Sequence, residues 1–350
     1  MIKLVNLIKR FKLPITKTFI ISLLLLAGGY KCFSQGKEAN IWYFGVAAGV
    51  DFNQGSPPAA LTNSQMYIIS GNTSGSATIS DSTGSLLFYS DGQKIWNKDH
   101  EIMQNGTNMG GPSTQGAMIV PKPGTDHLYY FFNFNNELIV DFQYSVIDMN
   151  LDNGRGAVLE TQKRIVLLED VSRHLSAIKN STTDEIWVLT HGLGDRNFYA
   201  FKITADSLHT EPVVSQGGSY IQYMFGYMKF SPNGQKVALT VEVQAFFEIM
   251  DFDINTGTVS DNNVVHNVNH FSAVGFSPDN TKFYAMAYDL FQYDLQAGSP
   301  QQIIDSEVLI SEVGSSHNAM QLGPDGKLYC SRGTQDYLSV INYPNLKGLA

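Results

Sequence analysis

The sequence predicts an all-β fold, a β-propeller of about six four-stranded blades. Aromatic residues make up 12% of the 350 residues, glycines number 31, and charged residues make up only 16%. This composition is typical of β-strands joined by tight turns. A short apolar segment followed by a turn also recurs six times along the chain. After residue 35, no stretch has the apolar periodicity of an amphipathic helix, which argues against a parallel α/β fold.

The recurring segment has the features of an innermost blade strand and the turn after it. Proline at the second turn position presets φ, and Gly or Asn at the fourth position tolerates a positive φ. Five of the six copies begin with Ala. Alanine suits strands that converge on a central channel, where larger side chains would collide. The copies are ATISDSTG (77–84), AMIVPKPG (117–124), AIKNSTTD (177–184), YMKFSPNG (227–234), AVGFSPDN (273–280) and AMQLGPDG (319–326).

Further strand-like runs follow each turn. Four short strands in a repeat of roughly 40–50 residues are the signature of a propeller blade. The second runs are 86–90, 128–134, 185–190, 236–240, 282–288 and 327–332. The third runs are 94–97, 142–149, 198–203, 246–253, 290–295 and 337–343. A weaker fourth run is visible in three repeats, at 163–168, 211–214 and 301–305.

Residues 1–35 have the pattern of a cleaved export signal. Six basic and no acidic side chains accompany an apolar core at residues 19–27, and Cys32 and Ser34 fit the small positions before a cut near Gln35. The core is about half the length that spans a bilayer, so we expect no stable membrane span after cleavage. The remaining chain has 17 basic and 32 acidic residues. So acidic a body is a poor partner for nucleic acid.

The sixth repeat ends after its third strand-like run, which leaves the propeller domain, residues 36–350, with an incomplete last blade. An unclosed ring would leave strand edges unpaired. The segment NIWYFGVAAGVDF (40–52) is strand-like and lacks a blade of its own. We therefore expect it to supply the missing outer strand and close the ring. The alternative is that the natural protein is longer and this chain is truncated.

Five segments, taken in order, resemble the N-terminal propeller of gliding-motility-associated or type IX secretion surface proteins of Bacteroidota. The resemblance implies a propeller exported to the cell surface, the medium or the periplasm. Family members typically continue into PKD domains and a C-terminal sorting domain, and this chain has neither. The turns SPNG and SPDN also resemble WD40-like repeats of TolB-type propellers. The five segments are residues 38–53, 77–106, 113–124, 186–203 and 319–348.

Three histidines and two tyrosines are the candidate ligand-binding residues. His174 and His270 each precede the repeat Ala by three residues, and His317 precedes it by two. We expect all three in loops at one propeller face, either lining the channel mouth or bonding to neighbouring blades. Tyr220 and Tyr223, with Tyr67 and Phe225, lie between predicted blades, where aromatic side chains bind protein or sugar or pack between blades. No metal or cofactor is expected, because the Asp-rich turns lack a complete calcium-ligand set.

Two functions remain open from the sequence. The favoured one is a secreted or cell-surface, non-catalytic binding or adhesion module that recognises protein or glycan at one propeller face. No GxSxG, HExxH or paired-histidine motif is present, so no catalytic residue is assigned. The alternative is a propeller hydrolase or lyase acting on polysaccharide or lactone, with carboxylates and the three histidines near the channel. Cys330 follows an apolar run and is expected to be a buried, inert thiol.

Overall fold

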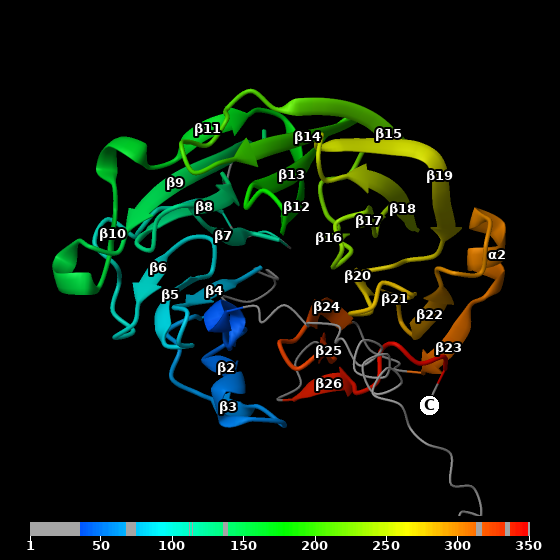
Figure 1. The fold of residues 1–350 in the computed structure, drawn as a ribbon, viewed down its shortest axis with the longest axis horizontal. Helices are drawn as coiled ribbons and strands as arrows, with labels where there is room; N and C mark the ends of the chain where they lie inside the picture. Colours follow the sequence, from blue (N-terminus) through cyan, green and yellow to red (C-terminus); the bar gives the residue numbers. More distant parts are fainter. Residues whose placement is uncertain are drawn as a thin grey trace, which may run out of the picture. The chain divides into compact units, whose positions relative to one another are not determined.

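The computed structural model describes residues 36–67, 75–111, 113, 115–135, 139–312, 317–332 and 337–348. The expected signal segment, residues 1–35, lies outside these residues. The described chain forms seven β-sheets arranged in a ring (Figure 1). The propeller prediction is therefore confirmed, whereas the predicted number of about six blades is wrong.

Each blade is made from one continuous stretch of chain, and its neighbouring strands are antiparallel. The strands of blades 1 to 3 are β1 (Ile41–Phe44), β2 (Ala48–Asp51), β3 (Ala59–Leu61); β4 (Ala77–Ser80), β5 (Leu86–Ser90), β6 (Ile95–Asn97); β7 (Ala117–Pro121), β8 (Leu128–Phe134), β9 (Phe142–Asp148), β10 (Ala157–Val158), β11 (Ile165–Leu168). The strands of blades 4 and 5 are β12 (Val171–Lys179), β13 (Ile186–Gly192), β14 (Asp195–Ile203), β15 (Val213–Ile221); β16 (Met228–Phe230), β17 (Lys236–Val241), β18 (Phe246–Asp253), β19 (Thr258–Val268). Those of blades 6 and 7 are β20 (Ala273–Phe276), β21 (Lys282–Met286), β22 (Leu290–Asp294), β23 (Val308–Ser311); β24 (His317–Leu322), β25 (Leu328–Arg332), β26 (Leu338–Ile341).

Short helices punctuate the loops. The 3₁₀ helices are η1 (Lys37–Ala39), η2 (Phe52–Gln54), η3 (Asp152–Gly154) and η4 (Glu160–Gln162), and the one α-helix of the described residues is α2 (Pro300–Asp305). No helix in the described part of the chain is long and apolar enough to cross a membrane.

The predicted four strands per blade hold for blades 4, 5 and 6 only. Within the described residues, blades 1, 2 and 7 have three strands, and blade 3 has five because β10 and β11 both pair with β9. The second and third predicted runs all form strands. The fourth run at 301–305 is wrong: these residues form α2, and β23 follows as the outer strand. Ser299 caps α2 and shares a capping box with Gln302, which favours a helix over a strand here.

The expectation that residues 40–52 complete the last blade is also wrong. Residues 41–44 pair with residues 48–51, and β2 then pairs with β3, so this segment builds blade 1. Blade 1 and blade 7 meet through side chains. The rings of Trp42 and Phe52 pack edge-on against Tyr329, with centroids 5.6 and 5.4 Å apart. Lys327 Nζ also donates to Ser56 Oγ at 3.0 Å.

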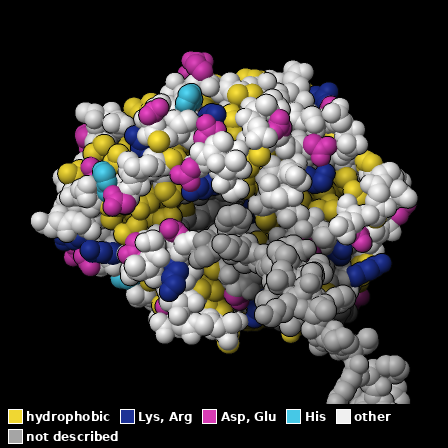
Figure 2. Space-filling view, in the orientation of Figure 1, with side chains coloured by type: hydrophobic (Ala, Val, Ile, Leu, Met, Phe, Trp, Pro, Cys, Tyr) yellow, Lys and Arg dark blue, Asp and Glu magenta, His cyan; other side chains and the backbone are white. Residues whose placement is uncertain are grey.

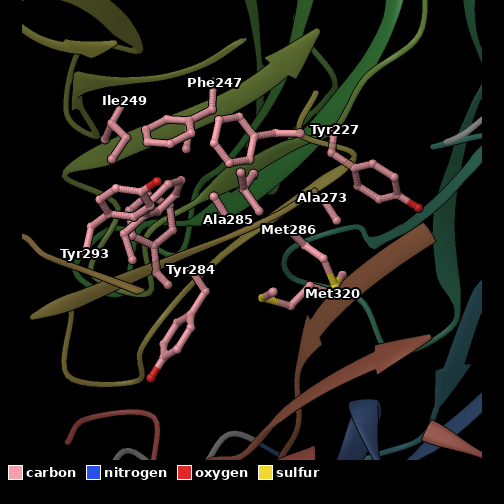
Figure 3. Packing of buried hydrophobic residues seen from close by; sticks show 14 of the residues in the cluster. Tyr227, Phe247, Ile249, Ala273, Tyr284, Ala285, Met286, Tyr293 and Met320 are labelled. Carbon is pink, nitrogen blue, oxygen red and sulfur yellow. The ribbon is translucent and has the colours of Figure 1, made fainter. Parts of the chain in front are cut away.

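The hydrophobic core lies between consecutive blades. The interface of blades 5, 6 and 7 is an example (Figure 3). Phe247 of blade 5 is fully buried, and its ring centroid lies 5.0 Å from that of Phe283 and 5.2 Å from that of Tyr293 in blade 6. Met320 of blade 7 belongs to the same cluster. Each such side chain contributes about 1.5–3 kcal/mol by its burial, so the blades stabilise one another.

Polar side chains join innermost strands across the centre of the ring. Gln115, just before β7, accepts hydrogen bonds from Leu175 N (3.0 Å) and Met228 N (2.8 Å) of blades 4 and 5. Lys229 Nζ on β16 donates to Gln321 Oε1 on β24 at 2.7 Å, passing β20 of the blade between them. Burial lowers the pKa of Lys229 to about 8. The hydrogen bonds to Met228 and Gln321 join blades that are not adjacent, blade 3 with blade 5 and blade 5 with blade 7.

The two faces of the ring differ in the loops that they carry. Turns between first and second strands, and between third and fourth strands, emerge on one face, the turn face. Loops between second and third strands, and connections between blades, emerge on the opposite face, the loop face. The β2–β3 loop of blade 1 meets the turn face, because Asn53 Nδ2 donates to Gly84 O in the first turn of blade 2 at 2.9 Å. The β1–β2 loop therefore lies on the loop face.

Candidate binding face and pocket

Exposed aromatic side chains gather on the loop face. Among the described residues, seven aromatic side chains are strongly exposed, and six of them lie on loops or strand ends of this face. Tyr67 is 74% exposed, Tyr220 49% and Tyr223 45%. Large exposed aromatic side chains on one face are typical of a surface that binds a partner. The six are Tyr67, Tyr220, Tyr223, Phe225, Tyr288 and Tyr337, and Tyr343 is the seventh.

The backbone that carries Tyr220 and Tyr223 is held in place by neighbouring loops. Gln244 of blade 5 donates from Nε2 to Tyr220 O at 2.9 Å and accepts from Gln222 N through Oε1 at 2.7 Å. Arg173 N donates to Met224 O at 2.8 Å. A loop fixed at both ends loses little conformational entropy when it binds a ligand. Tyr220 lies in β15, one residue before its end, and Tyr223 lies in the connection that follows; both side chains are exposed.

His174 is not in a loop, contrary to the prediction. It lies within β12 and is fully buried. Its Nδ1 lies 2.8 Å from Ser172 Oγ, and its Nε2 lies 2.7 Å from Thr240 O of blade 5. Burial lowers its pKa to about 4, so the ring is neutral at neutral pH. β12 begins at Val171, six residues before the repeat Ala177. His174 therefore lies inside the strand, at the interface between blades 4 and 5.

His270 and His317 lie outside the interface that buries His174. His270 lies in the exposed connection between β19 and β20, and its Nδ1 is 3.1 Å from Glu242 O of blade 5. His317 is the first residue of β24, and its side chain lies outside the described residues. In the described part of the chain, no three His, Cys, Asp or Glu side chains are grouped to hold a metal ion. Both described rings thus lie within hydrogen-bond distance of backbone carbonyls of blade 5.

A serine, a glutamate and a histidine meet near the outer edge of blades 4 and 5. Glu248 is only 3% exposed and accepts from Ser219 Oγ at 2.6 Å, Ser219 N at 2.9 Å and His266 Nδ1 at 2.9 Å. Serine and histidine both bind the carboxylate instead of each other. The cluster therefore lacks the hydroxyl-to-imidazole contact of a serine hydrolase relay. Its hydrogen bonds instead provide the buried Glu248 carboxylate with donors.

The Asp-rich turns use their carboxylates locally. Asp253 Oδ1 accepts from Asn255 N at 2.9 Å and Oδ2 accepts from Thr256 Oγ1 at 2.9 Å. The hydrogen bond from Asn255 N, with those that follow it, lowers the pKa of Asp253. Asp148 accepts from Asn150 N in the same way, at 2.9 Å. These contacts are those of Asx turns. Cys330 is buried, which raises its pKa to about 12, as expected for an inert thiol.

A cavity of about 510 Å³ opens at the outer edge of blade 3, with Asn108, Asp141, Gln143 and Arg164 among its lining residues. The sequence analysis singled out none of them. They meet only because β11 pairs with β9, and a local pattern does not reveal that pairing.

On the face shown in Figure 2, acidic and basic side chains are scattered instead of forming a patch of one sign.

Comparison with known proteins identifies the fold. No protein-family model matches the sequence, and no curated protein matches it. The β-propeller domain of Cps50 (Swd1) from Myceliophteria thermophila is similar, with TM-score 0.52 and 12% identity over 89% of this chain and 98% of that one. The periplasmic gluconolactonase PpgL of Pseudomonas aeruginosa has TM-score 0.50 and 11% identity over 89% of this chain and 93% of that one. Identities this low establish the fold alone: the chain is an all-β, seven-bladed propeller with mostly three or four strands per blade.

Proposed function

We propose that this chain is an exported, non-catalytic binding or adhesion module of the gliding-motility-associated type. It recognises protein or glycan through its loop face. The observation that carries the proposal is the gathering of six of seven exposed aromatic side chains on that face. The fixed backbone around Tyr220 and Tyr223 supports it, because aromatic side chains on a rigid loop make strong contacts at low entropic cost.

The environment of the histidines favours binding over catalysis. A hydrolase built around the channel would need imidazole or carboxylate groups that converge on one pocket. His174 is buried between blades, and the described ring of His270 bonds to the backbone of blade 5. The fold itself does not choose between the two functions, because it is shared by the Cps50 (Swd1) β-propeller domain and by a protein named gluconolactonase.

The binding proposal is tested with purified residues 36–350. Ligands recovered from a glycan array or a pull-down are titrated against the wild type and a Tyr220→Ala/Tyr223→Ala variant. Loss of aromatic anchors worth at least 2 kcal/mol should weaken binding roughly 30-fold. Tyr343→Ala is the matched control, because Tyr343 is exposed but lies away from the loop face. Equal affinities of the double variant and the wild type would contradict the assignment of the face.

The alternative is a hydrolase or lyase acting on polysaccharide or lactone. Incubation with glucono-δ-lactone and with soluble polysaccharides tests it directly, and we expect no turnover above the buffer rate. Turnover that disappears in a His270→Ala variant would replace the binding proposal with the enzymatic one. The proposed export is tested by N-terminal sequencing of protein from the medium and the cell surface. A start near Gln35 is expected, and an intact Met1 in the membrane fraction would refute it.

A further inference from the structure

The cavity at the outer edge of blade 3, the blade 3 pocket, has the size of a small-molecule site. Its volume of about 510 Å³ lies within the roughly 300–1,000 Å³ of ligand pockets. Its lining is polar, with carboxylate, amide, ammonium and guanidinium groups around one apolar residue, Val166. None of the exposed aromatic side chains of the loop face lines it.

Gln143 provides the floor of the pocket and has a fixed orientation. Its side chain is part of a residue only 1% exposed, and its Nε2 donates to Met109 O at 2.7 Å and to Asn133 Oδ1 at 3.1 Å. Asn133 in turn donates to Gly92 O and Met109 O, which leaves its Oδ1 as the acceptor. Both Gln143 amide protons are therefore used. Within the described residues, both hydrogen bonds of the Gln143 side chain are made by Nε2, so its Oε1 is the acceptor left for the pocket.

Asp141 provides a second acceptor beside the first. Its Oδ2 accepts from Asn135 Nδ2 at 2.8 Å, and its own N–H donates to Asn135 Oδ1 at 3.1 Å. This reciprocal pair holds the carboxylate at the start of β9, two residues before Gln143. No partner for the other oxygen, Oδ1, is found in the described chain. The floor thus presents two acceptors, one held by buried hydrogen bonds of Gln143 and one by part-buried hydrogen bonds of Asp141.

The rim supplies donors and one more acceptor. Lys163 and Arg164 precede β11, and Glu160 begins η4. Arg164 has a left-handed backbone, with φ of 56°, and its N–H donates to Ser145 Oγ at 2.9 Å. None of the ion pairs formed among the described residues includes Asp141, Glu160, Lys163 or Arg164. Two acidic and two basic groups thus face one pocket without neutralising each other directly.

We propose that the blade 3 pocket binds a neutral saccharide of one or two sugar units. Sugar hydroxyl groups donate and accept at once, so they can bond to the fixed acceptors of Gln143 and Asp141 and to the donors of Lys163 and Arg164. The charges of the lining cancel, so the pocket does not select a charged ligand. The site goes beyond the proposed loop-face function because it shares no residue with the aromatic side chains of that face.

The test is saturation-transfer NMR followed by calorimetric titration of residues 36–350 with single sugars. The probes are glucose, galactose, mannose, N-acetylglucosamine, cellobiose and lactose, with glycine and alanine as zwitterionic comparisons. At least one sugar should bind with a millimolar or lower Kd. Asp141→Asn replaces the free acceptor with a donor, and Arg164→Gly removes the guanidinium. Each should weaken that sugar at least about tenfold, the cost of one charged hydrogen bond.

The variants separate binding from folding. Arg164→Gly relieves a positive φ, so its melting temperature should not fall. Ala245→Gly is the matched control, because Ala245 also has a positive φ (58°) but lies in blade 5, and it should leave sugar binding unchanged. Tyr220→Ala/Tyr223→Ala should likewise leave it unchanged, which distinguishes failure here from failure of the loop-face proposal. Absence of sugar binding at tens of millimolar, full affinity in both pocket variants, or tighter binding of the amino acids would overturn the proposal.

Discussion

The buried His174 makes the stability of the propeller depend on pH in a defined window. Burial lowers its folded-state pKa to about 4, whereas an unfolded histidine titrates near 6.5. Between these two pKa values, the unfolded chain therefore binds a proton at His174 that the folded chain does not bind. The stabilisation is complete above about pH 6.5 and is lost as the pH falls toward 4. Between pH 7.5 and 4.5, this difference in pKa corresponds to a loss of roughly 2–3 kcal/mol in the free energy of unfolding.

The assay is urea unfolding followed by tryptophan fluorescence at several pH values, since Trp96 and Trp187 are buried in the folded protein. His174→Gln removes the titrating group. Between pH 7.5 and 4.5, the free energy of unfolding of this variant should fall by roughly 2–3 kcal/mol less than that of the wild type. Burial also lowers the pKa of His191, so some acid sensitivity should remain. The lowered pKa of Asp253 acts at lower pH, because its contribution is present above about pH 3.8 and lost below it.

His270→Gln serves as the control, because that side chain already lies in water in the folded protein. At pH 7.5 it should unfold at nearly the same urea concentration as the wild type. A wild type and a His174→Gln variant with the same pH dependence would refute the reasoning. That result would mean that the buried ring is protonated in place or that the interface between blades 4 and 5 opens to water.

Two further predictions concern packing. Gly226→Ala should destabilise the protein by about 3–5 kcal/mol, because the added methyl group would collide with Thr240 O and His174 Nε2. Thermal unfolding measures this loss. The control is Gly45→Ala, whose methyl group meets no neighbour and strains only the backbone, so it should cost about 1–2 kcal/mol. Phe52→Ala should cost about 3–5 kcal/mol, because Phe52 packs on both Trp42 and Tyr329. Hydrogen exchange should then increase first in β1 and β25, and uniform exchange across all seven blades would contradict a local seam between blades 1 and 7.

Much of the architecture could be predicted because propeller turns have a local chemical signature. The six copies of the recurring segment, five of which begin with Ala and four of which have Pro in or at the turn, predict the innermost strands of blades 2 to 7. Blade 1 has no such turn. Its strands are joined by a tight loop at residues 45–47, with positive φ at Gly45 and Ala47, and the last of them has only three residues. The sequence pattern of residues 40–52 therefore indicates a closing strand, although these residues build a blade.

The remaining errors have separate physical causes. The run at 301–305 is apolar enough for a strand, but Ser299 and Pro300 are helix-start residues that decide the matter locally. The repeat pattern predicts that the strand starts at Ala177 and therefore puts His174 in a loop. In the structure, β12 already begins at Val171. The blade 3 pocket depends on contacts between β9, β11 and the connection before β7. Such contacts follow from packing, so the residues carry no spacing that could reveal them.

The junction between blades 1 and 7 has a mechanical consequence. Every described sheet is built from one stretch of chain, so no backbone ladder crosses this junction. Aromatic contacts and the Lys327–Ser56 hydrogen bond join it. Each of the other six junctions is also bridged covalently by the chain that leads into the next blade. Within the described residues no chain segment bridges the seventh junction, so side-chain contacts carry a tangential force across it.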